Sequence, residues 1–273
     1  MSASAVELLA LARHPNVDAP FIRVSLAPDS AADDLAQILA DELVRRLGAP
    51  VLDLVLKREC HLGGTGPALD SSERAVLAAY VSADFSDGGN VTRIEGAVAE
   101  HLWASIAMSL DGDWGRPIFM EHDHFSVIDH GPDGLSIYDR HDEYHGFRLW
   151  ESKRHASDDS ITDTVTTAAG QLALNGTQYL ARLSKVLQTN VDPDVRRLGG
   201  VLVRAWHEKW ASAGVGVSLG RSAGGVIPDR PFMGLKRKFD LPDSGQLEGV
   251  LIEIPRFNEF AVRVRDRVLE GLR

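Results

Sequence analysis

Two carboxylates and a lysine near the middle of the chain lie on or beside segments that are otherwise apolar, where charged side chains are unexpected. The segment Gly131-Pro-Asp-Gly-Leu-Ser-Ile-Tyr is followed, after a charged stretch, by Phe147-Arg-Leu-Trp-Glu-Ser-Lys. Carboxylates such as Asp133 and Glu151 can hold a divalent ion that polarises a phosphoryl oxygen and helps to generate hydroxide from water. A lysine such as Lys153 can orient that water or stabilise the developing negative charge.

The second of these segments is predicted to be a buried β-strand. Side chains alternate between the faces of a strand, so Phe147, Leu149, Glu151 and Lys153 share one face. Trp150 on the opposite face indicates that the strand is covered on both sides and is therefore central. A charged pair that continues the apolar face of a central strand is costly unless it has a purpose.

Asp133 is the preferred second carboxylate. It precedes the turn-permissive Gly134 and begins a strand, residues 134–139, that a hairpin connection can pair with the strand of Glu151. Asp139 is an alternative, but antiparallel pairing would place it at the far end of the hairpin, away from Glu151. Asp129 is a weaker third candidate.

A helix upstream carries a further acidic candidate. Between residues 91 and 110 apolar side chains recur every fourth position, as is typical of an amphipathic helix with a buried face: Ile94, Val98, Leu102, Ile106 and Leu110. Glu100 lies just past the edge of this stripe. It is therefore expected to point along the core surface and not straight into water.

The remaining pattern predicts an α/β fold with a mixed central sheet flanked by helices. Helices are expected at residues 5–13, 29–47, 72–82, 158–188, 193–213 and 258–272. Further strands are expected at 20–26, 51–56, 125–128, 215–219 and 250–254. No internal repeat and no linker between separate domains is evident.

Composition restricts the function classes. The chain has 273 residues, 44% of them apolar, with no apolar run long enough to cross a bilayer. It begins without a signal-peptide pattern and has one cysteine, Cys60, which favours a cytoplasmic location. The net charge of −10 opposes binding of nucleic acid by the chain alone, because phosphate contacts normally require a basic surface.

The quoted motif resembles the PD-(D/E)xK nuclease superfamily: Pro132-Asp133, a hairpin, then Glu151-Ser152-Lys153. The resemblance is sharper to one branch, the nuclease-like subunit of the Hachiman antiphage defence system, which is similar from about Arg93 to Leu187. It implies a restriction-endonuclease-like core at residues 91–273 with an N-terminal α/β extension, residues 1–90, packed on it.

The same resemblance implies the chemistry and the partners. Glu100, Asp133 and Glu151 would hold Mg²⁺ or Mn²⁺, and Lys153 would complete the catalytic site. The substrate would be DNA, and a helicase-like ATPase subunit would recognise or open it. Such a partner would also ease the difficulty of the acidic net charge.

Two other interpretations of the function stay open. The chain could be a catalytically silent scaffold that binds a helicase partner. It could also be a histidine-ligated metal hydrolase, because the segment from Glu121 to His145 is dense in His and Asp, and His122 and His124 share a strand face. One compact basic cluster, Lys236-Arg-Lys238, and the pair Arg154-His155 are candidates for phosphate contacts.

Overall fold

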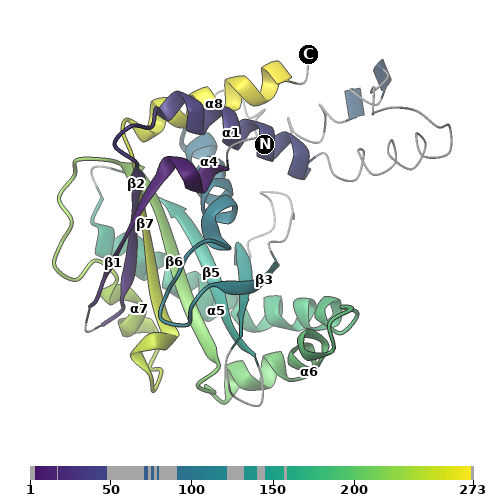
Figure 1. Ribbon diagram of the computed structural model, residues 1–273. Coiled ribbons are helices and arrows are strands. Elements are labelled where there is room, and N and C mark those ends of the chain that lie inside the picture. Colours follow the sequence, from purple (N-terminus) through teal and green to yellow (C-terminus); the bar gives the residue numbers. More distant parts are fainter. Residues whose placement is uncertain are drawn as a thin grey trace.

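The computed structural model describes residues 4–16, 18–47, 71–72, 75–76, 79, 91–121, 132–139, 145–156 and 159–271. Its strands are β1 (Leu9–His14), β2 (Phe21–Leu26), β3 (Pro117–Glu121), β4 (Gly134–Tyr138), β5 (Gly146–Arg154), β6 (Ala213–Ser222) and β7 (Leu247–Ile254). Its helices are α1 (Ala32–Leu47), α4 (Val91–Ala107), α5 (Ile161–Leu187), α6 (Pro193–His207), α7 (Met233–Lys238) and α8 (Phe257–Gly271), with short 3₁₀ turns η1 (Ala5–Leu8) and η2 (Ser244–Gln246) (Figure 1).

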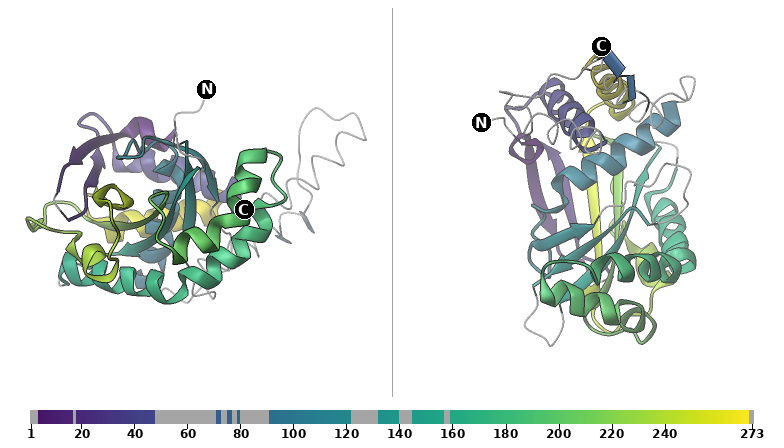
Figure 2. Two further views of the ribbon diagram at one scale, coloured as in Figure 1. Left: turned by 90° about the horizontal axis from the view of Figure 1, so that it is seen from below. Right: turned by 90° about the vertical axis from the view of Figure 1, so that its right-hand side faces the viewer.

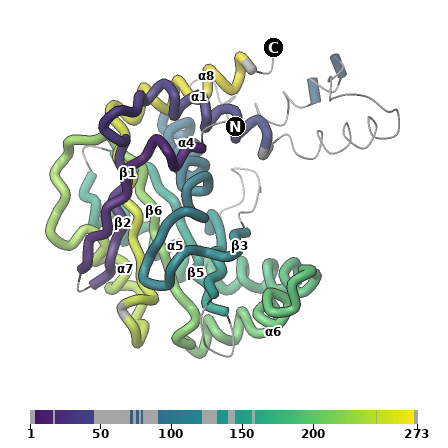
Figure 3. Tube along the Cα trace, viewed as in Figure 1, coloured from purple at the N-terminus to yellow at the C-terminus, as the bar shows by residue number. Residues whose placement is uncertain are grey.

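The strands form one mixed sheet in the order β1-β2-β7-β6-β5-β4-β3. Its four central strands, β2, β7, β6 and β5, are mutually parallel, whereas β1 pairs antiparallel on one edge and β4 and β3 on the other. The N-terminal strand β2 thus lies beside β7, which comes near the end of the chain (Figure 3). The sheet confirms an α/β fold with a mixed central sheet.

Helices cover both faces of the sheet. On one face α1, α4 and α8 pack together over Ile22, Trp150, Val250 and Ile252. On the other, α5, α6 and α7 pack over a second apolar cluster that includes Leu149. Figures 1 and 2 show the two groups of helices apart, with the strands between them. Strand β5 is therefore covered on both sides, as its sequence predicts.

Close approach between neighbouring strands, and between the sheet and α4, requires glycine at two positions. A Cβ atom on Gly216 of β6 would lie 2.3 Å from the ring of Trp150 on β5. A Cβ atom on Gly134, directly after Asp133, would lie 2.8 Å from the ring of Trp103 on α4. The two tryptophan rings also meet, with centroids 5.5 Å apart. Tight packing therefore holds the β4–β5 hairpin against α4.

Most of the expected elements are present, and the stripe along α4 is buried as predicted. The helix expected at 5–13 is wrong, because residues 9–14 pair in register with β2 as an edge strand, and this pairing overrides local helix propensity. The helix expected at 193–213 ends at His207, since Lys209 adopts a left-handed conformation (φ 53°) without the glycine that usually marks such an end. Strand β3 and helix α7 were not predicted individually.

Some expectations fall outside the described residues: the strands at 51–56 and 125–128 and most of the helix at 72–82. The division of the chain at residue 90 stays a prediction, although β1 and β2 belong to the same sheet as the later strands. No helix in the described ranges combines the length and the apolar character needed to cross a membrane.

Gly216→Ala should destabilise the protein by about 1–3 kcal/mol, because the added methyl group must displace the Trp150 ring in a packed core. The matched control is Gly200→Ala on α6, where a Cβ atom meets nothing within 4 Å. That change should stabilise by about 0.5–1 kcal/mol through helix propensity. Urea unfolding measures both, and equal effects of the two substitutions would contradict the packing argument.

Candidate active site at the start of the hairpin

The register of β4 with β5 brings Asp133 to Glu151. Gly134 lies opposite Trp150, so the residue before it lies beside the residue after Trp150. The Asp133 N–H donates to the Trp150 carbonyl (2.9 Å), and the Ser152 N–H donates to Asp133 Oδ2 (2.5 Å). Backbone hydrogen bonds therefore hold the Asp133 carboxylate next to the Glu151 strand.

Glu151 is buried, and Lys153 links it to solvent. The Glu151 residue is 3% exposed. Its Oε1 lies 2.5 Å from Lys153 Nζ, and the Lys153 side chain is 33% exposed. A partly exposed lysine side chain thus carries the ammonium group that contacts the buried carboxylate.

The two carboxyl groups are electrostatically strained. Burial, with the nearby charge of Asp133, raises the pKa of Glu151 to about 8, and Lys153 only partly offsets this. Burial also raises the pKa of Asp133 to about 6, against the opposing effects of Lys153 and the Ser152 N–H. Two carboxylates sharing one ammonium group leave an excess of negative charge that a cation would relieve.

Glu100 also acts on this group of charges. Burial alone lowers the pKa of Lys153, but the negative charges of Glu151, Asp133 and Glu100 outweigh it, so the pKa is raised. Glu100 is half-buried on α4. Its neighbour Ala99 packs closely on β6: a Cβ atom added to Gly220 would lie only 2.8 Å from the Ala99 side chain. The packing of α4 on the end of the sheet therefore brings Glu100 into the electrostatic environment of Lys153.

The donor set suits a hard divalent ion with much of its coordination from water or substrate. The contacts described use one oxygen of each carboxylate, Asp133 Oδ2 and Glu151 Oε1. Mg²⁺ commonly binds through one or two carboxylates and keeps several waters. In the described part of the chain, which includes Glu100, Asp133 and Glu151, no three or more His, Cys, Asp or Glu side chains form a group that could hold a metal ion. Asp133 and Glu151 could supply two ligands to such an ion, and its positive charge would favour the ionised form of both.

The alternative carboxylate, Asp139, lies at the other end of β4. Tyr138 pairs with Gly146, so Asp139 follows the far end of the pairing and is exposed. Its nearest described partner is His145, with Nδ1 3.6 Å from Oδ1. The geometry thus favours Asp133 over Asp139. Asp129, Cys60 and the histidines at 122, 124, 130 and 141 lie outside the described residues.

Sequence reasoning missed the residues that brace the hairpin. Arg148 is fully buried and makes an ion pair with Glu248 of β7, while Nη1 donates to the Tyr138 hydroxyl (3.1 Å) and Nη2 to the Gly245 carbonyl (2.9 Å). At the other end of β5, Arg154 pairs with Glu95 of α4 at 2.7 Å. The sequence offered one signal for these residues: Arg148 and Arg154 are charged residues on the Trp150 face of a strand that is predicted to be covered on both sides.

Comparison with known proteins identifies no family. No family model matches the chain, and none of the curated proteins compared with it matches either. The interpretation of this site therefore depends on its own geometry and on the motif.

The stability of the metal-free protein should fall as the pH rises. Folding favours the protonated carboxyl groups, so their contribution is complete below the ordinary pKa values. It is lost as the pH passes about 6 for Asp133 and about 8 for Glu151. Glu151→Gln carries no charge at any pH. The difference in the free energy of unfolding between Glu151→Gln and wild type should therefore shift in favour of the variant by roughly 1–3 kcal/mol when the pH is raised from about 5 to about 9.

Urea unfolding at the two pH values in a chelator checks this, with the exposed Asp139→Asn as control. Adding Mg²⁺ should flatten the pH dependence of wild type but not that of Glu151→Gln. A difference between wild type and Glu151→Gln that does not vary with pH would show that the carboxylate is not strained.

Proposed function

We propose that the protein is a divalent-metal-dependent nuclease of the PD-(D/E)xK type that cleaves DNA phosphodiester bonds. The observation that carries the proposal is the pairing of two strained carboxylates, Asp133 and Glu151, with a lysine that extends to the surface. These are the motif residues, and they lie at the start of an antiparallel hairpin within a mixed sheet. A restriction-endonuclease-like core is part of this proposal.

The chain's own residues divide the work as follows. Asp133 and Glu151 would hold Mg²⁺ or Mn²⁺, and Glu100 would support the ion or its water. The bound ion would polarise the scissile phosphate and lower the pKa of the attacking water. Lys153 Nζ would stabilise the negative charge that develops on the phosphoryl oxygens. Because the pKa of Glu151 is about 8, loading the site would release protons near neutral pH.

A partner protein would bring the nucleic acid. The net charge of −10 gives an overall field that repels DNA, so affinity from this chain alone should be weak. We propose that the chain is the effector subunit of a cytoplasmic antiphage system of the Hachiman type. A helicase-like ATPase subunit would present the DNA strand to the hairpin.

The decisive experiment compares DNA cleavage by four variants: Asp133→Asn, Glu151→Gln, Lys153→Ala and the control Asp139→Asn. Linear and circular DNA are incubated with Mg²⁺ or Mn²⁺, with and without an ATPase encoded beside the protein. The first three changes should each reduce cleavage at least roughly 100-fold, because each removes a metal ligand or the transition-state cation. Asp139→Asn should retain activity, since Asp139 lies at the opposite end of the hairpin.

Other outcomes select other functions. Cleavage unaffected by Glu151→Gln and Lys153→Ala would place the activity elsewhere and overturn the assignment. Tight binding of the ATPase without cleavage under any condition would favour a silent scaffold. Zinc or iron that remains through purification would favour a histidine-ligated hydrolase, because carboxylate sites hold magnesium weakly and exchangeably.

A further inference from the structure

A pocket of about 880 Å³ opens at the carboxyl ends of β5 and β6, beside the start of α8. Its polar lining includes Arg154, His155, Ser160, Arg221, Ser222 and Asn258. Arg154 directly follows Lys153 but belongs to the opposite face of β5, because side chains alternate along a strand. The pocket is therefore a separate feature from the carboxylate pair, although the same strand contributes to both.

The pocket lies where the connections of the sheet diverge. The chain leaves β6 toward α7, which packs with α5 on one face, whereas it leaves β7 toward α8, which packs with α1 and α4 on the other. Adjacent parallel strands whose following helices cover opposite faces leave a crevice at their carboxyl ends. Open α/β sheets commonly bind ligands there.

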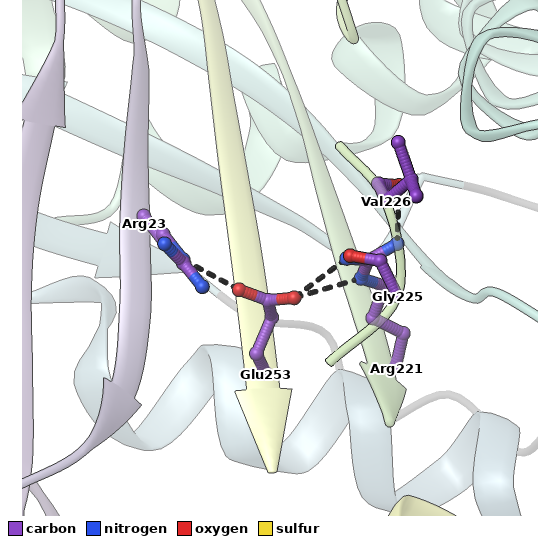
Figure 4. A network of polar contacts seen from close by, with 5 residues as sticks. All are labelled: Arg23, Arg221, Gly225, Val226 and Glu253. Carbon is purple, nitrogen blue, oxygen red and sulfur yellow. Dashed lines mark hydrogen bonds and ion pairs between the residues drawn. The ribbon is translucent and has the colours of Figure 1, made fainter. Parts of the chain in front are cut away.

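Two guanidinium groups share one carboxylate beside this crevice. Glu253 of β7 is buried, and its Oε1 accepts from Arg221 Nε (3.0 Å) and Nη2 (2.6 Å) while its Oε2 accepts from Arg23 Nε (2.5 Å). Arg221 also donates to the carbonyls of Gly225 (2.6 Å) and Val226 (3.3 Å), which belong to the pocket wall (Figure 4). The three charged side chains keep one net positive charge.

The amino ends of two long helices add to this positive potential. Helix α5 starts at Ile161 and α8 at Phe257, and both residues line the pocket. The Phe257 N–H donates to Ser222 Oγ (2.9 Å), whereas the side chain of Ser160, the N-cap of α5, makes no capping hydrogen bond. Helix amino ends favour anions through their N–H groups and their dipole.

Two acidic residues, Glu95 and Asp159, line the pocket together with the two arginines, Arg154 and Arg221. Glu95 is paired with Arg154, and Asp159 is exposed at the rim. The pKa of His155 is lowered, mainly by burial. The charges of Arg221 and Arg154 lower this pKa further, and the charge of Asp159 opposes them. A buried imidazole kept neutral beside guanidinium groups can accept or donate a hydrogen bond to a ligand without adding charge.

We propose that this pocket binds a phosphoryl group carried by a nucleotide or by the end of a nucleic-acid strand. Guanidinium groups, hydroxyls and helix amino ends are the donors that phosphate oxygens require. The volume exceeds that of a phosphate and falls in the range of small-molecule sites, so it has room for the group that carries the phosphate. The inference does not depend on nuclease activity.

Calorimetry on the metal-free, full-length protein in a chelator tests the proposal. The probes are ADP against adenosine, and a 5′-phosphorylated oligonucleotide against the same strand with a 5′-hydroxyl. At least one phosphorylated probe should bind about tenfold or more tighter than its counterpart, and the probe that does so identifies the source. If neither phosphate improves binding, the proposal is wrong.

Ser160→Asp and Ser160→Asn form the matched pair of variants. Both residues cap helices well, so both proteins should fold, but only the aspartate places a negative charge at the amino end of α5. Ser160→Asp should bind the phosphorylated probe with roughly tenfold lower affinity than Ser160→Asn. Equal affinities in the two variants would overturn the assignment.

Glu95→Gln provides an independent variant with the opposite expectation. The amide oxygen can still accept from Arg154 Nη1, but the negative charge that offsets Arg154 is gone. Binding of the phosphorylated probe should become several-fold tighter. Unchanged or weaker binding in Glu95→Gln, with an unchanged melting temperature, would show that Arg154 does not meet a phosphate.

Discussion

The register between β4 and β5 is the constraint on which the candidate site depends. Asp133 meets Glu151 only because Gly134 pairs with Trp150, and a slip of one residue would turn every side chain of β4 to the other face. Packing resists such a slip, since the ring of Trp103 lies where Gly134 has no side chain. Arg148 of β5 adds a second restraint, because it pairs with Glu248 on β7 while its Nη1 donates to the hydroxyl of Tyr138 on β4.

Buried charge in this sheet is of two kinds, matched and unmatched. Arg148 with Glu248, and Arg23 and Arg221 with Glu253, give each buried carboxylate at least one guanidinium partner. At the hairpin two carboxylates compete for one ammonium group. The pKa values of both are raised, as burial also raises the pKa of Glu248 beside its guanidinium partner. Matched pairs stabilise a packed sheet, whereas an unmatched excess of negative charge suits a cation.

The end of β5 contributes to two separate polar environments. Lys153 belongs with Glu151 and Asp133, while Arg154 and His155 line the pocket beneath the amino ends of α5 and α8. The pleat of the strand separates them, because successive side chains take opposite faces. An acidic protein can in this way carry a local site for phosphate despite a net charge of −10.

Local periodicity determined much of this protein from the sequence alone. The alternation from Phe147 to Lys153 predicted a central strand ending in charge, and the four-residue stripe predicted the buried face of α4, because each pattern reflects one element's own geometry. The expected hairpin pairing likewise placed Asp133, and not Asp139, by Glu151. Only the tertiary structure decided that residues 9–14 are a strand and that Arg23, Arg221 and Glu253 meet. These features depend on pairing between segments as many as 230 residues apart, and that pairing leaves no periodic trace in either segment.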